Sequence, residues 1–221
     1  LVGSTIGMHH WQNTGSSAFV EVAARTLPEE FDSRALLSAI AADADGDGDA
    51  DLWWPGFGLF RNDGSGAFSL DASVSAPLGI GIPADLDGDR DLDFVLESDR
   101  VLFNDGHGRL SENRFPATLT DPYQPSEAAF VRVADLDGDG DQDVAGWWHG
   151  IGFNDGNGSL VPVHPSRMPP TPFGLRVLAV ADVNGDRHPD LLLHDDWVKL
   201  WISDGAGGYR DASSLLPATR F

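Results

Sequence analysis

The chain has 221 residues, of which 41% are hydrophobic and none is cysteine, so it can bury a core but has no disulfide or thiolate chemistry. Its formal net charge of -21, from 35 acidic and 14 basic residues, argues against nucleic acid as a partner, because phosphate binding needs a cationic face. No apolar run has the length of a membrane-spanning helix, and 26 Gly with 14 Pro favour an all-β protein of short strands joined by turns.

One acidic pattern occurs four times. Each copy has an oxygen-bearing side chain at positions 1, 3, 5 and 9 and glycine at position 4, and apolar residues follow it directly. The copies span residues 43–51, 85–93, 135–143 and 182–190, and they hold 18 Asp, about half of all acidic residues. A solubilising or halophilic surface would scatter its acid, whereas one repeated pattern indicates a repeated metal-binding loop.

A turn follows each acidic loop at nearly constant spacing. Asn or Ser comes 11, 11, 11 and 13 residues after position 9, and Asp-Gly follows it at once, at Asn62, Asn104, Asn154 and Ser203. Asp-Gly between two apolar stretches is a hairpin signal. The loops begin 42, 50 and 47 residues apart, so loop and turn together define four repeat units.

Each repeat unit divides into four short strands. The first strand enters the acidic loop, the second leaves it, and the third and fourth flank the Asp-Gly turn. First strands are expected at residues 36–42, 130–134 and 175–181, second strands at 52–54, 94–96, 144–145 and 191–193, third strands at 58–61, 101–103, 151–153 and 198–202, and fourth strands at 67–70, 109–111, 159–163 and 209–212. Second strands are apolar at consecutive positions, so both of their faces should be buried. Four strands in about 45 residues are typical of a β-propeller blade.

The N-terminal segment has the pattern of half such a unit. Residues 10–19 align with residues 59–68, so residues 5–24 are expected to form the third and fourth strands of a blade without an acidic loop. We therefore expect a single β-propeller domain over residues 1–221, with four complete blades and an N-terminal half blade, or about five blades in all. The repeat units are expected at residues 1–24, 36–74, 78–115, 128–165 and 174–216.

This count leaves the closure of the ring open. The last unit has its own fourth strand, so nothing in the chain remains to complete the half blade. Either the half blade closes an imperfect five-bladed ring by itself, or upstream sequence or self-association with a second copy completes it. The chain begins at Leu1 without an initiator Met or a recognisable signal peptide, so we interpret it as a processed or excised part of a longer chain.

Calcium is the cation that the acidic loops suit best. It takes about 6–8 oxygen ligands, alternate residues of a tight loop can direct side chains at one point, and glycine at position 4 permits the bend. Position 7 is Asp in three loops and His in the fourth, which indicates that its backbone carbonyl is the ligand. The predicted metal-binding residues, for about four ions, are Asp43, Asp45, Asp47, Asp49, Asp51, Asp85, Asp87, Asp89, Asp91, Asp93, Asp135, Asp137, Asp139, Asp141, Asp143, Asp182, Asn184, Asp186, His188 and Asp190.

Other interpretations of the loops agree less well with the sequence. An EF-hand needs a bidentate Glu at position 12 and flanking helices, but position 12 is Trp54, Leu96, Gly146 or Leu193. Magnesium prefers a small octahedral site that keeps several waters, and zinc or copper would favour His or Cys. Clustered carboxylates can also act as acid and base, but four recurring copies suit a structural metal better than one active site, so no catalytic residue is predicted.

The segments at residues 85–96 and 182–193, with turns such as Asn154-Asp-Gly-Asn-Gly, resemble FG-GAP/VCBS repeats. This family includes the propeller of integrin α subunits and many secreted bacterial and fungal proteins, some of them lectins. The resemblance implies a β-propeller whose loops bind calcium through positions 1, 3, 5 and 9 and the carbonyl at position 7. It does not fix a ligand, because the scaffold serves adhesion, sugar binding and accessory roles in enzymes.

A candidate ligand site lies outside the acidic loops. Trp147, Trp148 and His149 fall at the bend between the second and third strands of their unit, where the other units have turn-like residues. The Trp pair could stack on a sugar ring or a partner side chain, or it could pack between neighbouring blades. The Trp residues expected in the core are Trp11, Trp201 and at least one of Trp53 and Trp54.

We therefore expect a calcium-stabilised binding module that acts outside the cell or at its surface, with no catalytic activity of its own. Its partner would be a glycan, as for a lectin, or a surface protein, as in adhesion. The alternative is an accessory or catalytic propeller of a larger secreted enzyme that acts on polysaccharides. A purely structural spacer is a third interpretation.

Overall fold

The computed structural model of the protein describes residues 2–4, 7–9, 11–13, 15, 18–21, 39–54, 58–74, 81–96, 100–107, 109–114, 131–146, 151–170, 176–194 and 197–217. Within these ranges the chain forms twenty β-strands and two single-turn 3₁₀ helices, η3 (Pro165–Arg167) and η4 (Ser213–Leu215). Among the described residues no helix is long and apolar enough to cross a membrane. The described part of the chain is therefore all-β, as its turn-rich sequence predicts.

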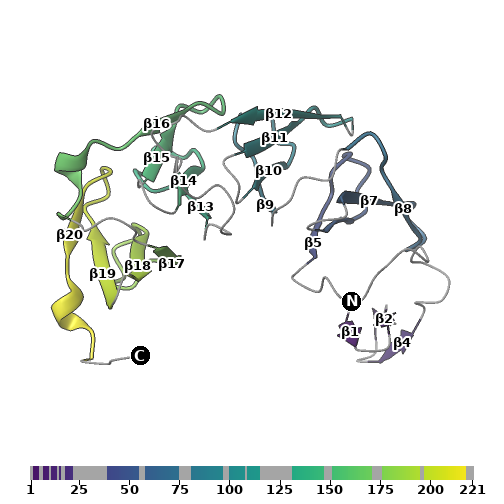
Figure 1. The fold of residues 1–221 in the computed structure, drawn as a ribbon, viewed down its shortest axis with the longest axis horizontal. Helices are drawn as coiled ribbons and strands as arrows, with labels where there is room; N and C mark the ends of the chain where they lie inside the picture. The colour runs from purple at the N-terminus through teal and green to yellow at the C-terminus, as the bar shows by residue number, and fades with distance from the viewer. Residues whose placement is uncertain are drawn as a thin grey trace. The chain divides into compact units, whose positions relative to one another are not determined.

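Four antiparallel sheets of four strands follow one another along the chain (Figure 1). The first blade contains β5 (Ile40–Ala42), β6 (Asp51–Trp54), β7 (Gly58–Asn62) and β8 (Phe68–Leu70), and the second contains β9 (Gly81–Ala84), β10 (Asp93–Leu96), β11 (Arg100–Asn104) and β12 (Leu110–Arg114). The third contains β13 (Arg132–Ala134), β14 (Asp143–Ala145), β15 (Ile151–Asn154) and β16 (Leu160–Pro162), and the fourth contains β17 (Arg176–Ala181), β18 (Asp190–His194), β19 (Val198–Ser203) and β20 (Tyr209–Asp211). In every blade the strands lie side by side in sequence order, so the four predicted blades are confirmed.

The first of two compact units, residues 1–81 with 106–109, contains the first blade and two N-terminal hairpins. The hairpin strands are β1 (Val2–Ser4) with β2 (Gly7–His9), and β3 (Trp11–Asn13) with β4 (Phe19–Glu21). Trp11 lies opposite Glu21, which is the register of Phe60 with Leu70 in the first blade. The β3–β4 pair is therefore the hairpin that the alignment of residues 10–19 with residues 59–68 predicts.

One aromatic residue of this unit departs from the expected core. Trp11 is 43% exposed, whereas Trp53 and Trp54 are only 1% and 3% exposed. Within the described residues, the sheet that contains Trp11 has two strands, so it lacks the second strand that covers this position in a complete blade. The prediction that Trp11 belongs to the core is wrong, while that for Trp53 and Trp54 is confirmed.

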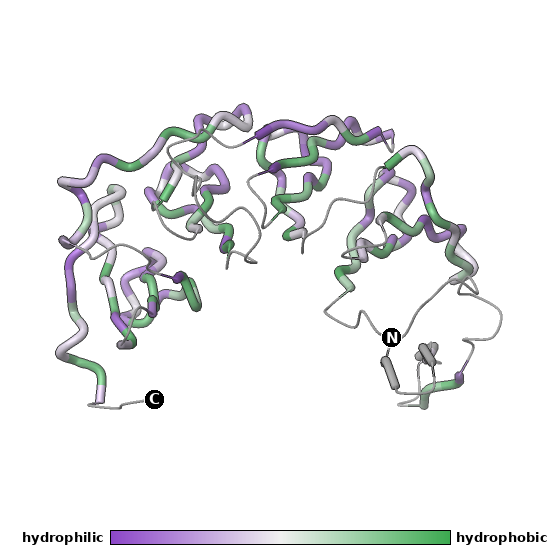
Figure 2. The backbone as a smooth tube through the Cα atoms, in the orientation of Figure 1, coloured by the Kyte–Doolittle hydropathy of each residue, from purple (hydrophilic) through white to green (hydrophobic). Residues whose placement is uncertain are grey.

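In the first three blades the second strand is buried along its whole length. Every residue of β6, β10 and β14 is buried, because consecutive apolar residues place hydrophobic side chains on both faces of the sheet. The outermost strand of the second blade, β12, is exposed at four of its five residues. Figure 2 shows this contrast between the hydrophobic residues of β10 and the hydrophilic β12.

In the second unit, residues 82–105 with 110–221, the core lies between successive blades. One cluster joins the second and third blades and includes Leu86, Val95 and Val144. Another joins the third and fourth blades and includes Leu136, Leu191 and Trp201, which is 4% exposed as predicted. Because the blades of this unit share their cores, the second and third acidic loops are held at the edge of packed interfaces.

Candidate metal centres

Each acidic loop joins the first and second strands of its blade. The loop begins directly after β5, β9, β13 or β17, and its position 9 is the first residue of β6, β10, β14 or β18. Position 9 is therefore fixed inside the sheet, while positions 1 to 8 form the connection. This placement is the one that the sequence pattern predicts.

Position 1 organises the backbone of the loop. In all four loops its Oδ1 accepts a hydrogen bond from the position-4 N–H at 2.7–2.9 Å. Its Oδ2 accepts from the position-6 N–H at 2.8–3.1 Å. Position 6 has a positive φ whether it is glycine or not, with φ of 78° at Arg90 and 74° at Arg187. The four loops thus share one backbone conformation, which the position-1 carboxylate holds. The residues at position 1 are Asp43, Asp85, Asp135 and Asp182.

Position 9 ties the loop to the rest of the blade. Its Oδ2 accepts from the position-2 N–H at 2.7–3.1 Å. Its Oδ1 accepts from the backbone N–H of the Asn or Ser that opens the Asp-Gly turn, at 2.7–2.9 Å. In three blades that Asn donates in return from Nδ2 to the position-8 carbonyl oxygen, at 3.1–3.3 Å. The residues at position 9, all buried, are Asp51, Asp93, Asp143 and Asp190.

Burial makes the position-9 carboxylates of the first three loops costly to ionise. Loss of hydration raises the pKa of Asp93 and of Asp143 to about 6, although backbone hydrogen bonds oppose the shift. Burial also raises the pKa of Asp51. The pKa of Asp87 and that of Asp137, at position 3, are raised by burial and then by the neighbouring position-5 carboxylates. A cation among these groups would favour their charged forms, because it offsets both the lost hydration and the mutual repulsion.

Three of the loops bring positions 1, 3 and 9 together. In each of these carboxylate triads, one oxygen from each residue lies within 4.8 Å of the others. The triads are Asp43 with Asp45 and Asp51, Asp85 with Asp87 and Asp93, and Asp135 with Asp137 and Asp143. An all-oxygen donor set suits calcium rather than a softer transition metal. Asp45 Oδ1 is buried and has no hydrogen-bond partner, so it is free to serve as a ligand. These residues fit a calcium ion.

Positions 5 and 7 are arranged differently. The position-5 carboxylate accepts a hydrogen bond from the position-7 N–H at 2.9–3.0 Å, and among the described residues position 5 does not join the triads. In three loops the position-7 side chain lies against a glycine of its own turn, as Asp49 does at Gly64 and His188 does at Gly205. The position-7 side chains are therefore in contact with the turn and are not part of the triads. This agrees with the expectation that position 7 binds the ion through its backbone carbonyl oxygen. Ligation by positions 5 and 7 stays a prediction.

The fourth loop departs from the other three. Its position 3 is Asn184, whose Nδ2 donates to Asp186 Oδ2 at 2.7 Å. Within the described ranges, the acidic and His side chains of this loop do not form a triad like those of the other three. A fourth calcium ion therefore stays a prediction. The candidate ligand residues Trp147, Trp148 and His149 lie outside the described residues.

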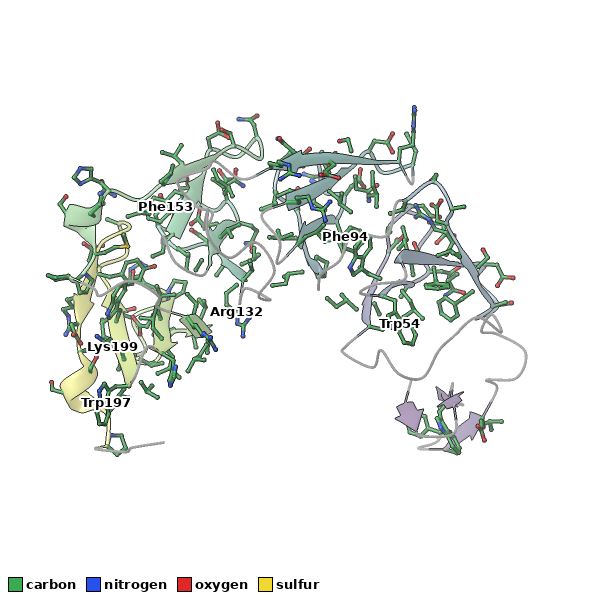
Figure 3. The ribbon with its side chains drawn as sticks, viewed as in Figure 1. Trp54, Phe94, Arg132, Phe153, Trp197 and Lys199 are labelled. Carbon is green, nitrogen blue, oxygen red and sulfur yellow. The ribbon has the colours of Figure 1, made fainter. Side chains whose placement is uncertain are left out.

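Contacts between successive blades of the second unit were not predicted from the sequence. Asn154 Nδ2 donates to the Leu86 carbonyl oxygen, at position 2 of the second loop, at 2.7 Å, and Tyr209 Oη donates to the corresponding oxygen of Leu136 at 3.4 Å. Arg132 on β13 donates to the carbonyl oxygen of Leu178 on β17 at 2.9 and 3.2 Å (Figure 3). The recurring Asn at the start of the turn was the one signal available for the Asn154 contact, and the sequence held none for those of Tyr209 and Arg132.

Glycines make the same interfaces close. A Cβ on Gly88, at position 4, would lie 3.2 Å from the carbonyl oxygen of Gly156 in the next blade's turn, and a Cβ on Gly138 would lie 3.1 Å from that of Gly205. At Gly88 and Gly138, position 4 therefore needs glycine for two reasons, a positive φ and the close approach of another backbone. The second and third acidic loops are therefore part of the interfaces between successive blades.

Repeated four-stranded blades with an acidic loop between the first two strands define a protein of the β-propeller class. Residues 85–146 match the model of the FG-GAP-like repeat, so the resemblance in the sequence is confirmed for that stretch. A search of curated proteins found no match. Among solved structures, the chain is similar to an Agrocybe aegerita lectin described for its specific recognition of non-reducing terminal N-acetylglucosamine. The TM-score is 0.51 at 20% identity, over 80% of this chain and 52% of that one, so this chain spans about half the length of the lectin and the likeness concerns the fold.

Proposed function

We propose that the protein is a calcium-stabilised β-propeller that binds carbohydrate outside the cell or at its surface. Calcium binding is supported by the three carboxylate triads, each of which has a buried Asp at position 9. Carbohydrate binding is supported by the similarity of the fold to that of a lectin.

Calcium in the loops serves structure in this proposal. A bound ion would supply the positive charge that the carboxylates at positions 1, 3 and 9 share. Position 1 orders the loop backbone, and position 9 connects the loop to the third strand through the turn N–H. Ordering of these two residues therefore fixes the first three strands of a blade that has little core of its own.

A polar cavity in the second unit offers a place for a sugar. It has a volume of about 790 Å³ and lies between η3 and the outer part of the fourth blade. Its lining combines hydrogen-bonding side chains, such as Arg167, Asn184 and Asp204, with small apolar areas of the largely buried Ile202 and Tyr209. A sugar ring presents hydroxyl groups at its rim and an apolar face, so this mixture of groups suits it.

A glycan array probed with the calcium-loaded protein and with the protein in EDTA tests the proposal. We expect binding to a restricted set of glycans with calcium, those with terminal N-acetylglucosamine among them, loss after chelation and recovery when calcium returns. Arg167→Ala should reduce binding if the cavity is the site, because it removes a hydrogen-bond donor from the lining. Arg109→Ala, which changes an exposed arginine outside the cavity, is the matched control.

The other outcomes separate the alternatives. Binding to surface proteins but to no glycan would favour an adhesion module. New reducing ends or unsaturated products from a polysaccharide would favour a part of an enzyme. Absence of any ligand in a broad glycan and protein screen would contradict the proposal and favour a structural spacer.

A further inference from the structure

The first acidic loop has a neighbour that the other three lack. The third-strand residue directly before the turn is Arg61 in the first blade, whereas the corresponding residues are Phe103, Phe153 and Ile202. In the second unit the ring of Phe153 lies against Gly207 of the next blade, and Ile202 is 4% exposed. Arg61 instead directs its guanidinium group at its own acidic loop.

Two of the three triad carboxylates contact this guanidinium group. Arg61 Nη1 lies 3.3 Å from Asp51 Oδ2, at position 9, and 3.5 Å from Asp45 Oδ2, at position 3. The Arg61 side chain is 16% exposed and that of Asp51 is 1% exposed. Because solvent screens such buried charges poorly, the positive charge of Arg61 acts on these two carboxylates.

A second carboxylate keeps the guanidinium group in this place. Nε and Nη2 of Arg61 both donate to Asp71 Oδ2 at 3.2 Å. Asp71 is itself held, because its Oδ1 accepts from the backbone N–H of Ser73 at 2.9 Å and from its hydroxyl at 2.5 Å. Arg61 is therefore anchored on the side away from the loop and cannot leave the loop without losing two hydrogen bonds.

The arginines within the other loops have a different position. Arg90 and Arg187 occupy position 6 of the second and fourth loops, and both residues are exposed. A cation at the surface is screened by water and salt, so these two arginines should affect a bound ion much less than Arg61 does. Among the four loops, the first has a fixed and partly buried positive charge beside its carboxylates.

We infer that Arg61 is an internal cation of the first acidic loop, which holds the Asp45 and Asp51 carboxylates in place without calcium and makes this loop the weakest calcium site of the three triads. The inference rests on the calcium binding of the proposed function. Two positive charges at a partly buried site repel each other, so a calcium ion gains less free energy here than in the second or third loop. The first blade would then keep its loop in order at calcium concentrations that empty the other triads.

Calorimetric titration of the calcium-free full chain with calcium tests this inference. Asp43→Ala and Asp135→Ala assign the binding phases to the first and third loops, and we expect the weakest triad phase to vanish with Asp43→Ala. Arg61→Leu should tighten that phase at least about tenfold, because the repulsion is removed, and should leave the third-loop phase unchanged. Arg61→Lys, which keeps the charge, should stay close to the unsubstituted protein. Arg100→Leu is the matched control, since Arg100 is also a third-strand arginine and pairs with Glu112.

Asp71→Asn is a second, nearly isosteric test for the case in which Arg61→Leu does not fold. It removes the counter-charge but keeps an acceptor oxygen for Arg61 Nε and Nη2, so the guanidinium group stays beside the loop and the first-loop affinity should fall further. Circular dichroism of each variant with and without calcium shows whether it is folded. An unchanged or weaker first-loop affinity in Arg61→Leu, or a tighter one in Asp71→Asn, overturns the inference. Absence of any calcium binding in the unsubstituted protein would instead reject the proposed function.

Discussion

Asn154 donates a hydrogen bond from Nδ2 to the carbonyl oxygen of Leu86 at 2.7 Å, although 68 residues separate the two in the sequence. Leu86 is position 2 of the second acidic loop, and its N–H donates to Asp93, the buried residue of the triad. The same Nδ2 of Asn154 also donates to the Gln142 carbonyl oxygen at 3.1 Å, within its own loop. One amide thus connects two successive acidic loops, so order in either loop favours order in the other.

Asn154→Ala should therefore destabilise the second unit more than a turn substitution usually does. It leaves the buried Leu86 carbonyl oxygen without this donor, which should cost about 1–3 kcal/mol of unfolding free energy. Urea unfolding in excess calcium measures the effect. Asn157→Ala is the control, because Asn157 is exposed in the same turn and should change stability by less than about 0.5 kcal/mol. Equal effects of the two substitutions would show that the Asn154–Leu86 hydrogen bond is not important.

Calcium removal should lower the melting temperature sharply. An ion that binds only the folded protein stabilises it by about 2.7 kcal/mol per site at a hundred times the dissociation constant. Calcium should restore the melting temperature better than magnesium does, since magnesium prefers a small octahedral site with bound waters. Asp135→Ala should lose one bound ion by calorimetry or metal analysis, and an unchanged ion count would reject the third loop as a site. An identical melt before and after complete chelation would contradict a structural role for the ions.

The metal-free protein should lose stability as the pH rises from about 4 to about 7. Burial raises the pKa of Asp93 and of Asp143 from 3.8 to about 6 in the folded state. The folded protein therefore holds these protons more tightly than the unfolded chain, so the stability that they contribute is fully present below about pH 4 and is lost as the pH rises through about 6. Each group accounts for up to about 3 kcal/mol of this loss.

Urea unfolding in EDTA across this pH range measures the effect. The double variant Asp93→Asn with Asp143→Asn should show a flatter pH dependence, because its amides do not titrate. In saturating calcium the trend should reverse for the unsubstituted protein, since the ion binds the ionised carboxylates and is released as they become protonated. Parallel pH curves of the double variant and the unsubstituted protein in EDTA would refute the assignment to these two residues.

The blades and loops could be predicted because their causes are local. Consecutive apolar residues such as Phe94, Val95 and Leu96 form a strand that is buried on both faces, and an Asp-Gly turn at fixed spacing sets the hairpin register. The grouping of positions 1, 3 and 9 follows from the same spacing, because position 9 opens the second strand and faces the loop that precedes it.

The rest depends on residues far apart in the sequence. The contact of Arg61 with its loop depends on how the third strand pairs with the second, and a lone arginine before a turn has no distinctive pattern. The Asn154–Leu86 hydrogen bond depends on how two blades pack. The recurring Asn in the sequence indicated the residue type at this position but not its partner in the other blade. Trp11 was assigned to the core by alignment with a complete blade, but its own sheet has two strands within the described residues, and its side chain is exposed.

Gly88→Ala should destabilise the protein more than Gly140→Ala, although both glycines have a positive φ. The φ of Gly88 is 76° and that of Gly140 is 100°. A left-handed conformation costs an alanine about 1–2 kcal/mol at either position. A Cβ on Gly88 would in addition lie 3.2 Å from the Gly156 carbonyl oxygen, whereas nothing lies within 4 Å of a Cβ on Gly140. Arg90 and Arg187 occupy the position of Gly140 in the second and fourth loops, so Gly140→Arg should also be tolerated. Urea unfolding of the three variants in excess calcium decides the matter: equal losses for Gly88→Ala and Gly140→Ala would mean that the contact between successive blades has no energetic weight.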